Sequence, residues 1–268
     1  GIHVVKEDSA FVYISVGAGE NWDNFVNWSL RKDYGGIENL SLIPGNVGSA
    51  PIQNIGAYGV ELDSVFESCR AISLENKKVK IFHKIDCDFT YRSSVFKEKL
   101  KNKYIISRVV FKLTKKSHFL KTNYKPLKEL IKIKNISNPT IQDISNLVKE
   151  IRSSKLPDPK IIGNCGSFFK NPIISKNKLE KISSIDKLIP FYKLSDEKFK
   201  IPAAWLIEKC GMKGRIEGQT GTHKEHALVI INLGAATGTE IYNFSQKIKK
   251  LVLKKFNILL EEEVNIID

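Results

Sequence analysis

The chain has 268 residues, of which 42% are hydrophobic and 27% charged, a composition typical of a globular protein with one large or two modest domains. No apolar run approaches the roughly 18–20 residues that span a bilayer, and the first residues do not form a signal peptide, so we expect a cytoplasmic protein without a membrane segment. The formal net charge is +14, but only six of the 43 basic residues are arginines and the lysines are scattered, which favours an anionic small substrate over nucleic acid.

The first 114 residues predict one helix among several strands. Alternating apolar residues over 11–19 end in glycines, which indicates a strand that runs into a tight loop. The next segment, 20–33, spaces its large apolar side chains at helical intervals, and a glycine-dense stretch follows at 41–59. Further strands are expected at 67–74, 77–83 and 103–114, the first two joined by a hairpin turn at Glu75 and Asn76.

The chain changes character between 115 and 160. Two short amphipathic helices are expected, at 126–134 and 140–155, and the second places its branched apolar residues on one face. The prolines of 156–159 then stop helix formation, because each disfavours helical geometry in the residue before it. We therefore predict a domain boundary here, with a first domain of 1–156 and a second of 157–257.

The remaining sequence mixes helices and strands. A helix over 202–211 begins with Pro and ends on Gly, and a longer helix over 237–257 follows the capping residue Thr237. A buried strand is expected at 227–232, and the last segment, 258–268, has strand character. Together these elements predict an α+β protein of two domains.

The cysteine pattern argues against metal and disulfide roles. The cysteines are spread along the chain, without a C-x-x-C pair or a neighbouring histidine cluster. A chain long enough to bury a large core has little need of a disulfide framework, so we expect reduced thiols and no metal site. The cysteines are Cys69, Cys87, Cys165 and Cys210.

The stretch 44–59, PGNVGSAPIQNIGAYG, is rich in glycine and carries almost no charge. Glycines let a backbone approach a ligand closely, and Ser49, Gln53 and Asn54 are able to form hydrogen bonds with it. The stretch is not a dinucleotide fingerprint, because no G-x-G-x-x-G opens a helix. A glycine-rich loop of no special purpose is the alternative interpretation.

In the segment FTYRSSVF (89–96), Tyr91 and Arg92 stand side by side within an apolar frame. An arginine in this position offers a fixed, always protonated fork to a carboxylate or an enolate oxygen. A structural ion pair is the alternative role for this arginine.

In the segment GNCGSFFKNP (163–172), Ser167 follows a glycine and precedes two phenylalanines. A hydroxyl beside aromatic bulk is able to donate a proton in a partly dry pocket. There is no G-x-S-x-G elbow, which disfavours acyl-transfer chemistry. A polar turn beside a core pair of phenylalanines is the alternative.

The segment LEEEV (260–264) places three carboxylates in an otherwise apolar terminal strand. Side chains alternate across a strand, so Glu261 and Glu263 share one face and Glu262 points the other way. A solvated strand edge is the commoner explanation of such a run. Among the histidines, His223 and His226 flank a possible pocket loop.

Taken together, these segments resemble the motifs of one enzyme family. Their order is that of the MurB-type UDP-N-acetylenolpyruvoylglucosamine reductases, and the resemblance covers essentially the whole chain. The joint pattern is specific, although each segment is weak alone. The tyrosine-bearing loop near 122–127 is similar to that of the longer subtype. The matching segments are VGAGENW (16–22), IPG-x-VG-x-x-PIQNIGAYG (43–59), YR-x-S-x-F (91–96), KLPDPK (155–160), GSFFKNP (166–172) and LE-x-EV (260–264).

The resemblance implies a fold and a reaction. The fold is an FAD-binding domain of the vanillyl-alcohol-oxidase-like type, followed by an α+β substrate-binding domain, with the last strand returning to the active site. In the implied reaction, NADPH reduces FAD, and reduced FAD converts UDP-N-acetylenolpyruvoylglucosamine to UDP-N-acetylmuramate for peptidoglycan synthesis. The expected partners are this UDP-sugar and NADPH, without nucleic acid or a membrane, and the expected state is a monomer.

By the same resemblance, the catalytic residues are Arg92, Ser167 and Glu263. Arg92 and Glu263 face the enolate-like charge that develops when hydride adds to the enolpyruvyl methylene, because such charge is costly in a desolvated cleft. Ser167 delivers the proton to the neighbouring carbon. Serine is a weak acid, so this role requires a nearby cation that favours its alkoxide.

The family pattern also implies binding residues. Lys155 and Lys200 suit a diphosphate as point charges. The residues expected beside the flavin are Ser49, Ile52, Gly56 and Ile106. Those expected to face the substrate or its diphosphate are Tyr58, Tyr91, Tyr124, Lys155, Asn171, Tyr192 and Lys200.

The sequence departs from the family pattern at its start. It begins just before VGAGENW, so the resemblance predicts that an N-terminal segment, with the glycine-rich loop that holds the FAD pyrophosphate, is missing. An inactive fragment of the enzyme is therefore one alternative. A related flavin oxidase and a non-catalytic lysine-rich binding protein are the others.

Overall fold

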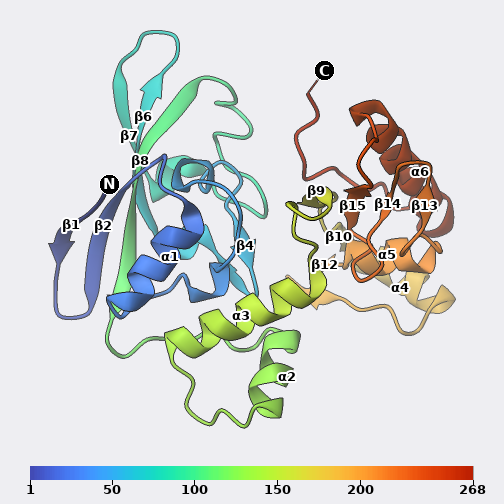
Figure 1. Cartoon of the computed structure of the whole chain (residues 1–268), viewed down its shortest axis with the longest axis horizontal. Helices are drawn as coiled ribbons and strands as arrows, with labels where there is room; N and C mark the ends of the chain where they lie inside the picture. The colour runs from blue at the N-terminus through green and yellow to red at the C-terminus, as the bar shows by residue number, and fades with distance from the viewer. Residues whose placement is uncertain (268) are drawn as a thin grey trace. The chain divides into compact units, whose positions relative to one another are not determined.

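The computed structural model describes residues 1–267 and divides the chain into two compact units, Gly1–Arg152 and the residues from Ser153 onward. The division falls inside α3 (Ile141–Lys155), and the boundary expected from the sequence, between 156 and 157, lies just after that helix. Both units contain helices and strands (Figure 1), which agrees with the predicted α+β class. Among residues 1–267, no helix combines the length and the apolar character that a membrane crossing requires.

The first unit is built on one antiparallel sheet. Its strand order is β1-β2-β8-β6-β7, and the short strand β3 also pairs with β8 (Figure 1). Strand β2 alternates buried and half-buried residues, so one of its faces lies in the core. The predicted strands were found, and β1 and β3 are additions. The bounds are β1 Ile2–Glu7, β2 Phe11–Gly17, β3 Tyr34–Gly35, β6 Phe66–Ser73, β7 Val79–His83 and β8 Tyr104–Lys115.

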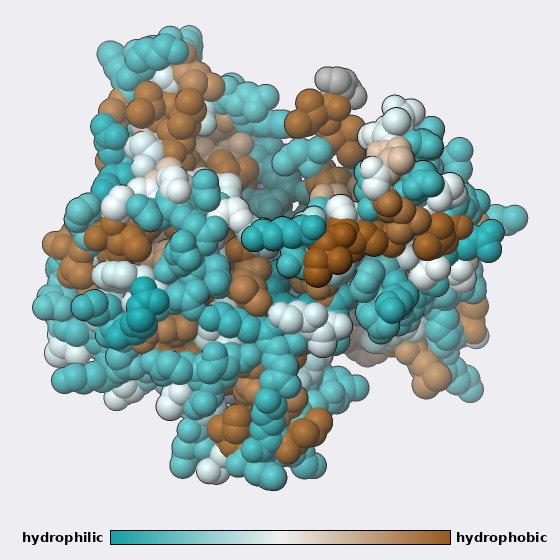
Figure 2. Space-filling model, in the orientation of Figure 1, coloured by the Kyte–Doolittle hydropathy of each residue, from teal (hydrophilic) through white to brown (hydrophobic). Residues whose placement is uncertain are grey.

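The predicted hairpin joins β6 and β7. Its turn is closed by the hydrogen bond from Ser73 N to Lys78 O, 2.9 Å, and Lys77 takes a positive φ of 60°. Figure 2 shows brown, apolar surface over this hairpin. Val79 and Ile81 are each 48% exposed there.

Helix α1 (Trp22–Arg31) covers the buried face of the sheet. It begins where the Asn21 side chain accepts a hydrogen bond from Asn24 N, 3.0 Å, which satisfies one free amide of the first turn. Phe25 packs on Phe111 of β8, with ring centroids 4.9 Å apart. Full burial of such a side chain contributes about 1.5–3 kcal/mol, so this apolar stripe explains why the predicted helix docks on the sheet.

Helices α2 (Lys125–Ile133) and α3 form a smaller core of the first unit. The apolar face predicted for α3 is confirmed, because its five branched residues are buried. The helix ends at Lys155, directly before the proline-containing segment. The buried residues of the α3 face are Ile141, Ile144, Leu147, Val148 and Ile151.

The second unit contains two small antiparallel sheets and three helices. One sheet has the order β13-β14-β15-β9 and the other β10-β12-β11. The predicted capping of α6 by Thr237 is confirmed, since its side chain and that of Glu240 bond each other's backbone. The bounds are β9 Gly163–Ser167, β10 Ile173–Ser175, α4 Lys176–Ile185, β11 Tyr192–Lys193, β12 Lys198–Lys200, α5 Ala203–Lys209, β13 Ile216–Glu217, β14 Thr220–Thr222, β15 Val229–Asn232 and α6 Gly238–Phe256.

The strand predicted over 258–268 was wrong for the described part of that segment. Residues 258–267 form one isolated bridge, between Glu262 and Phe169, instead of a ladder. Two backbone hydrogen bonds flank the bridge, from Lys170 N to Glu261 O at 2.9 Å and from Glu263 N to Phe168 O at 2.8 Å. The alternating sequence predicts a full strand, but backbone pairing extends over only these few residues. Residue 268 lies outside the described residues.

Candidate active site

In the first unit, the loop after β2 packs against the glycine-rich stretch. Gly48 N donates to Ala18 O at 2.9 Å, and Trp22 N donates to Gly45 O at 3.0 Å. A Cβ on Gly48 would lie 2.5 Å from the Cβ of Ala18, so only glycine allows this approach. The loop after β2 and the glycine-rich stretch are therefore packed directly against each other.

The glycine-rich stretch also binds the segment that carries Arg92. Asn54 Nδ2 donates to Thr90 O at 3.1 Å, and Ser94 Oγ donates to Ile52 O at 2.7 Å. Between these bonds, Arg92 Nη2 donates to Gly56 O at 2.6 Å. Two segments that are separate in sequence are thus joined on both sides of the predicted catalytic arginine.

Arg92 is held in an unusual backbone conformation. Its φ is +56°, a left-handed value that costs about 1–3 kcal/mol for a residue other than glycine and persists only when its surroundings fix it. The guanidinium lies over the Tyr91 ring, 5.0 Å from the centroid. Lys97 Nζ donates to Arg92 O at 3.3 Å. The side chain is half-buried, which suits a fork that binds an anion.

Tyr58 and Tyr124 form a second cluster in the first unit. Their rings meet edge to face, with centroids 5.3 Å apart. Asn39 Nδ2 donates to Tyr58 O and to Lys121 O, both at 2.9 Å, and so ties the loop before Tyr124 to the glycine-rich stretch. Burial raises the pKa of Tyr58, against the opposing effect of its hydrogen-bond partner Arg152. The pKa of Arg152 is lowered, chiefly by burial.

The residues expected beside the flavin lie along the glycine-rich stretch and on β8. Ser49 is exposed and its hydroxyl donates to Asn46 O at 2.7 Å, while Ile52 is half-buried. A flat ring system needs apolar contact and close backbone approach, and Ser49, Ile52 and Gly56 fit that requirement. Ile106 has only 6% of its surface exposed and pairs with Ala71, so it offers a flavin little contact area.

In the second unit, Ser167 is the last residue of β9. Gly166 precedes it with a positive φ of 73°, and Ser167 pairs with Val229 of β15. Its neighbour Phe168 donates to Leu228 O and accepts from Glu263 N, both at 2.8 Å. The fold of this unit therefore brings the backbone of Glu263 to the residue next to Ser167. Arg92 belongs to the other unit.

Two of the three terminal carboxylates are engaged by lysines. Lys170 forms an ion pair with Glu261. Lys249 Nζ donates to both carboxylate oxygens of Glu262, at 2.7 and 2.9 Å. Burial alone would raise the pKa of Glu262, but its hydrogen bonds from Lys249 and Gln246 outweigh burial and lower it. These contacts give Glu261 and Glu262 a role in fastening the terminal segment.

The other substrate-binding candidates of the second unit occupy three places. Asn171 Oδ1 accepts from Ala203 N at 2.8 Å and so fixes the start of α5. Tyr192 and Lys200 are cross-strand partners on β11 and β12, with the Lys200 ammonium 5.7 Å from the centre of the Tyr192 ring. Lys155 is exposed at the end of α3.

The structure shows that His226 is a partly buried polar residue of the second unit. Burial, followed by the charge of Lys155, lowers the pKa of His226. Its Nδ1 is buried, and among residues 1–267 it has no hydrogen-bond partner. The turn that carries it leads into β15, the strand that pairs with Ser167. The sequence indicated a possible pocket loop here but assigned the histidine no role.

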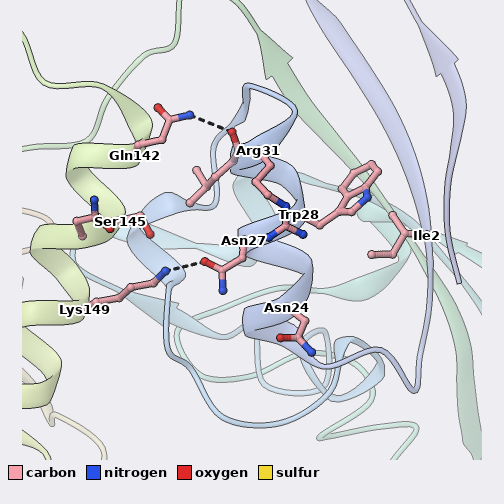
Figure 3. Close-up of a pocket in the computed structure, with 10 residues that line it drawn as sticks. Ile2, Asn24, Asn27, Trp28, Arg31, Gln142, Ser145 and Lys149 are labelled. Atoms are coloured by element: carbon pink, nitrogen blue, oxygen red, sulfur yellow. Dashed lines mark hydrogen bonds between the residues drawn. The ribbon is translucent and has the colours of Figure 1, made fainter.

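A cavity of about 680 Å³ lies between α1 and α3 in the first unit (Figure 3). Lys149 Nζ donates to Asn27 Oδ1 across it at 2.6 Å, and Gln142 Nε2 donates to Leu30 O at 2.9 Å. Its lining contains none of the predicted site residues. The lining residues are Ile2, Asn24, Asn27, Trp28, Leu30, Arg31, Gln142, Ser145, Asn146 and Lys149.

Comparisons with known proteins match both units. Residues 158–267 match the family model of the UDP-N-acetylenolpyruvoylglucosamine reductase C-terminal domain, and residues 2–79 match that of an FAD binding domain. The solved structure of UDP-N-acetylenolpyruvylglucosamine reductase (MurB) from Thermus caldophilus is similar, with a TM-score of 0.63 at 23% identity, covering 94% of this chain and 71% of that one. This likeness supports the fold.

Sequence relatives extend over the whole chain. The UDP-N-acetylenolpyruvoylglucosamine reductase of Flavobacterium johnsoniae is 48% identical over 100% of this chain and 79% of its own length. The reductase of Amoebophilus asiaticus is 46% identical over 100% of this chain and 78% of its own length. The reductase of Pseudomonas aeruginosa is 40% identical over 99% of this chain and 78% of its own length. Identity at this level over nearly the full chain establishes ancestry. The chain belongs to the UDP-N-acetylenolpyruvoylglucosamine reductase family.

Proposed function

We propose that this chain reduces UDP-N-acetylenolpyruvoylglucosamine to UDP-N-acetylmuramate, a precursor of peptidoglycan, with FAD as cofactor and NADPH as reductant. Relatives named for this substrate match the chain along its whole length. The structural observation that supports the proposal is the 2.8 Å hydrogen bond from Glu263 N to Phe168 O, because it brings the backbone of Glu263 to the residue that follows Ser167. A hydroxyl and a carboxyl group carried on neighbouring segments suit the proton transfer that completes reduction of a double bond.

FAD, once bound, supplies the hydride that saturates the enolpyruvyl methylene carbon. The chain must then stabilise the negative charge that spreads toward the substrate carboxylate. The Arg92 guanidinium suits this role because it is always protonated and is fixed by Gly56 O and by the Tyr91 ring. A preorganised donor of this kind is worth about 10²–10³ in rate when it faces a developing oxyanion.

Ser167 is proposed to deliver the proton to the carbon next to the methylene. Its position at the end of β9, after Gly166 and before the buried Phe168, fixes the hydroxyl on a rigid strand. Glu263 is proposed to face the same substrate group as Arg92, where its protonated carboxyl group donates a hydrogen bond to the developing enolate. We propose that all three residues act on one bound substrate.

The other proposed site residues contact the substrate or the flavin. Lys155, Lys200 and Asn171 suit the diphosphate, since two of them carry a point charge and the third an amide. Tyr192 lies across from Lys200 and suits a sugar or base ring. In the first unit, Tyr58, Tyr91 and Tyr124 are proposed to face the substrate, while Ser49, Ile52, Gly56 and, to a lesser extent, Ile106 contact the flavin.

The proposal is tested by separating the two half-reactions. The protein is mixed with FAD, free flavin is removed by gel filtration, and the retained flavin spectrum is recorded. NADPH is then added without oxygen, and the UDP-enolpyruvyl sugar is added last. We expect NADPH to bleach the flavin absorbance and the sugar to restore it.

The other outcomes identify the alternatives. Bleached flavin that regains its colour with oxygen but not with the sugar would indicate a flavin oxidase and overturn the proposal. A protein that retains no flavin at any FAD concentration would indicate a non-catalytic chain. UDP-N-acetylglucosamine, which lacks the double bond, serves as the control sugar and should restore no colour.

We also propose that the protein acts as a monomer in the cytoplasm. A UDP-sugar and NADPH are both cytoplasmic metabolites, and a single chain carries all the site residues named above. Light scattering should give a mass near that of one 30.3 kDa chain. A mass of twice that value at micromolar concentration would contradict the monomer.

A further inference from the structure

The two-stranded hairpin whose Gly56 carbonyl accepts a hydrogen bond from Arg92 also carries the carboxylate of Glu61. Strands β4 (Gly56–Ala57) and β5 (Val60–Glu61) form a two-stranded ladder in which Gly56 pairs with Glu61. A Cβ on Gly56 would lie 2.9 Å from Arg92 Nη1 and 2.9 Å from Glu61 Cγ. The guanidinium and the stem of Glu61 therefore occupy the same side of β4, and the missing side chain of Gly56 makes room for both.

Asn54 fixes that carboxylate. It is only 1% exposed, and its Nδ2 donates to Glu61 Oε2 at 3.0 Å and to Thr90 O at 3.1 Å. Its Oδ1 accepts from Asp63 N at 3.0 Å, so all three of these bonds tie β5 and the Arg92 segment to one buried amide. Asn54 has a φ of +46°, a left-handed value that asparagine tolerates better than most residues.

We propose that Glu61, oriented by Asn54, is a positioning residue for Arg92. An arginine side chain has considerable rotamer freedom, and a donor stabilises developing charge well only if it is already in place. The Gly56 carbonyl accepts from one end of the guanidinium, and the carboxylate of Glu61, on the neighbouring strand, attracts its inner edge and so fixes its orientation. The fork is thereby held with its outer edge toward the substrate. This inference rests on the function proposed above for Arg92.

The first test measures the guanidinium without any flavin. Six arginines occur in the sequence, so a protein labelled with ¹⁵N-arginine gives few side-chain Nε signals, and Arg92→Lys identifies the signal of Arg92. In Glu61→Gln, which keeps the shape but removes the charge, we expect that signal to move toward the free-arginine position and to exchange faster with water. The exposed Glu75→Gln is the matched control and should leave it unchanged. An Arg92 signal that is identical in Glu61→Gln and in the wild type would overturn the proposal.

The second test uses the flavin-loaded protein. Glu61→Gln should slow reoxidation of the flavin by the UDP-enolpyruvyl sugar by at least about tenfold, and should leave flavin reduction by NADPH within about twofold. In an Arg92→Lys background, Glu61→Gln should slow flavin reoxidation much less, because the guanidinium that Glu61 positions is absent. Equal factors in the two backgrounds would mean that Glu61 acts independently of Arg92.

A second variant tests the amide that orients Glu61. Asn54→Asp keeps the size of the side chain and the bond from Asp63 N, but replaces the donor that binds Glu61 and Thr90 with an oxygen. It should reproduce the pattern of Glu61→Gln in both tests. If the wild type itself is not reoxidised by the sugar, the proposed function fails, while the arginine signal still decides whether Glu61 positions Arg92.

Discussion

A serine hydroxyl is a weak proton donor, so the environment of Ser167 decides whether it can act. Ser167 is half-buried at the end of β9 and is followed by the buried Phe168, whose carbonyl accepts from Glu263 N. Ser167→Ala should leave flavin reduction by NADPH unchanged and slow reoxidation by the UDP-enolpyruvyl sugar by about 10²–10⁴, the usual contribution of a positioned acid. Stopped-flow absorbance measures both steps. Ser184→Ala, in the exposed part of α4, is the control, and an equal loss in both half-reactions would contradict an acid role.

At the scale of residues, the sequence predicted candidate catalytic residues but not the residues that contact them in the fold. Arg92 and Ser167 stood out because each occupies a short polar motif beside aromatic residues. The sequence indicates Asn54 only as a residue able to form hydrogen bonds, and no motif in it indicates Glu61. Their importance comes from cross-strand pairing and from burial of one amide, which depend on contacts that no local pattern specifies.

At the scale of elements, the contact between the loop after β2 and the glycine-rich stretch depends on one missing side chain. In Gly48→Ala the new Cβ would meet the Cβ of Ala18 at 2.5 Å, so one of the loops must shift. We expect a loss of about 1–3 kcal/mol in the free energy of unfolding, together with weaker retention of FAD. Gly19→Ala is the matched control, because a Cβ there has no atom within 4 Å. Urea unfolding and the flavin content after gel filtration measure the two effects, and equal behaviour of the two variants would refute this account.

The terminal segment is fastened to α6 by Glu262 and Lys249. Because the folded state lowers the pKa of Glu262, this pair stabilises the fold above the unfolded carboxyl pKa of about 4.3, and the contribution disappears as the pH falls through the lower folded value. At neutral pH the free energy of unfolding of Glu262→Gln should therefore be about 1 kcal/mol lower than that of the wild type. This difference in free energy should become smaller only as the pH falls below the unfolded carboxyl pKa. Urea titrations along a pH series test this. The exposed Glu180→Gln should show no such dependence, and a constant difference for Glu262→Gln would speak against the ion pair.

The elements that could be predicted are those whose pattern is long and local. Helices α1, α3 and α6 carry apolar stripes over several turns, and β8 is a twelve-residue strand. The short strands β9–β12 have two to five residues each and exist only through their partners. In the terminal segment a strand was predicted that did not form. Its alternating sequence is typical of a strand, but the segment around Phe169 pairs with it through only one bridge.

At the scale of the molecule, each of the two units has its own main apolar core. The first is centred on the five-stranded path of the sheet and α1, and the second on β15 and α6. The change of character between 115 and 160 predicted a division into two domains, and the family models match one region in each unit, residues 2–79 and residues 158–267. Composition alone supplied only the size and the charge. Those quantities limit the kind of ligand but do not locate its site.

The net charge of +14 has a consequence for the whole molecule. A substrate with a diphosphate and a carboxylate is attracted by such a field before any contact forms, and the attraction is screened over about 10 Å at 0.1 M salt. Raising potassium chloride from about 50 to 500 mM should therefore lower kcat/KM for the UDP-enolpyruvyl sugar several-fold.

The rate of flavin reoxidation at saturating sugar provides the internal control for this prediction. Once the substrate is bound, its position is set by short contacts that salt screens much less, so this rate should change little over the same range. A parallel fall of both quantities would place the salt effect on the bound complex. A kcat/KM independent of salt would show that the scattered lysines do not guide the substrate, and would leave recognition to residues such as Lys155 and Lys200 alone.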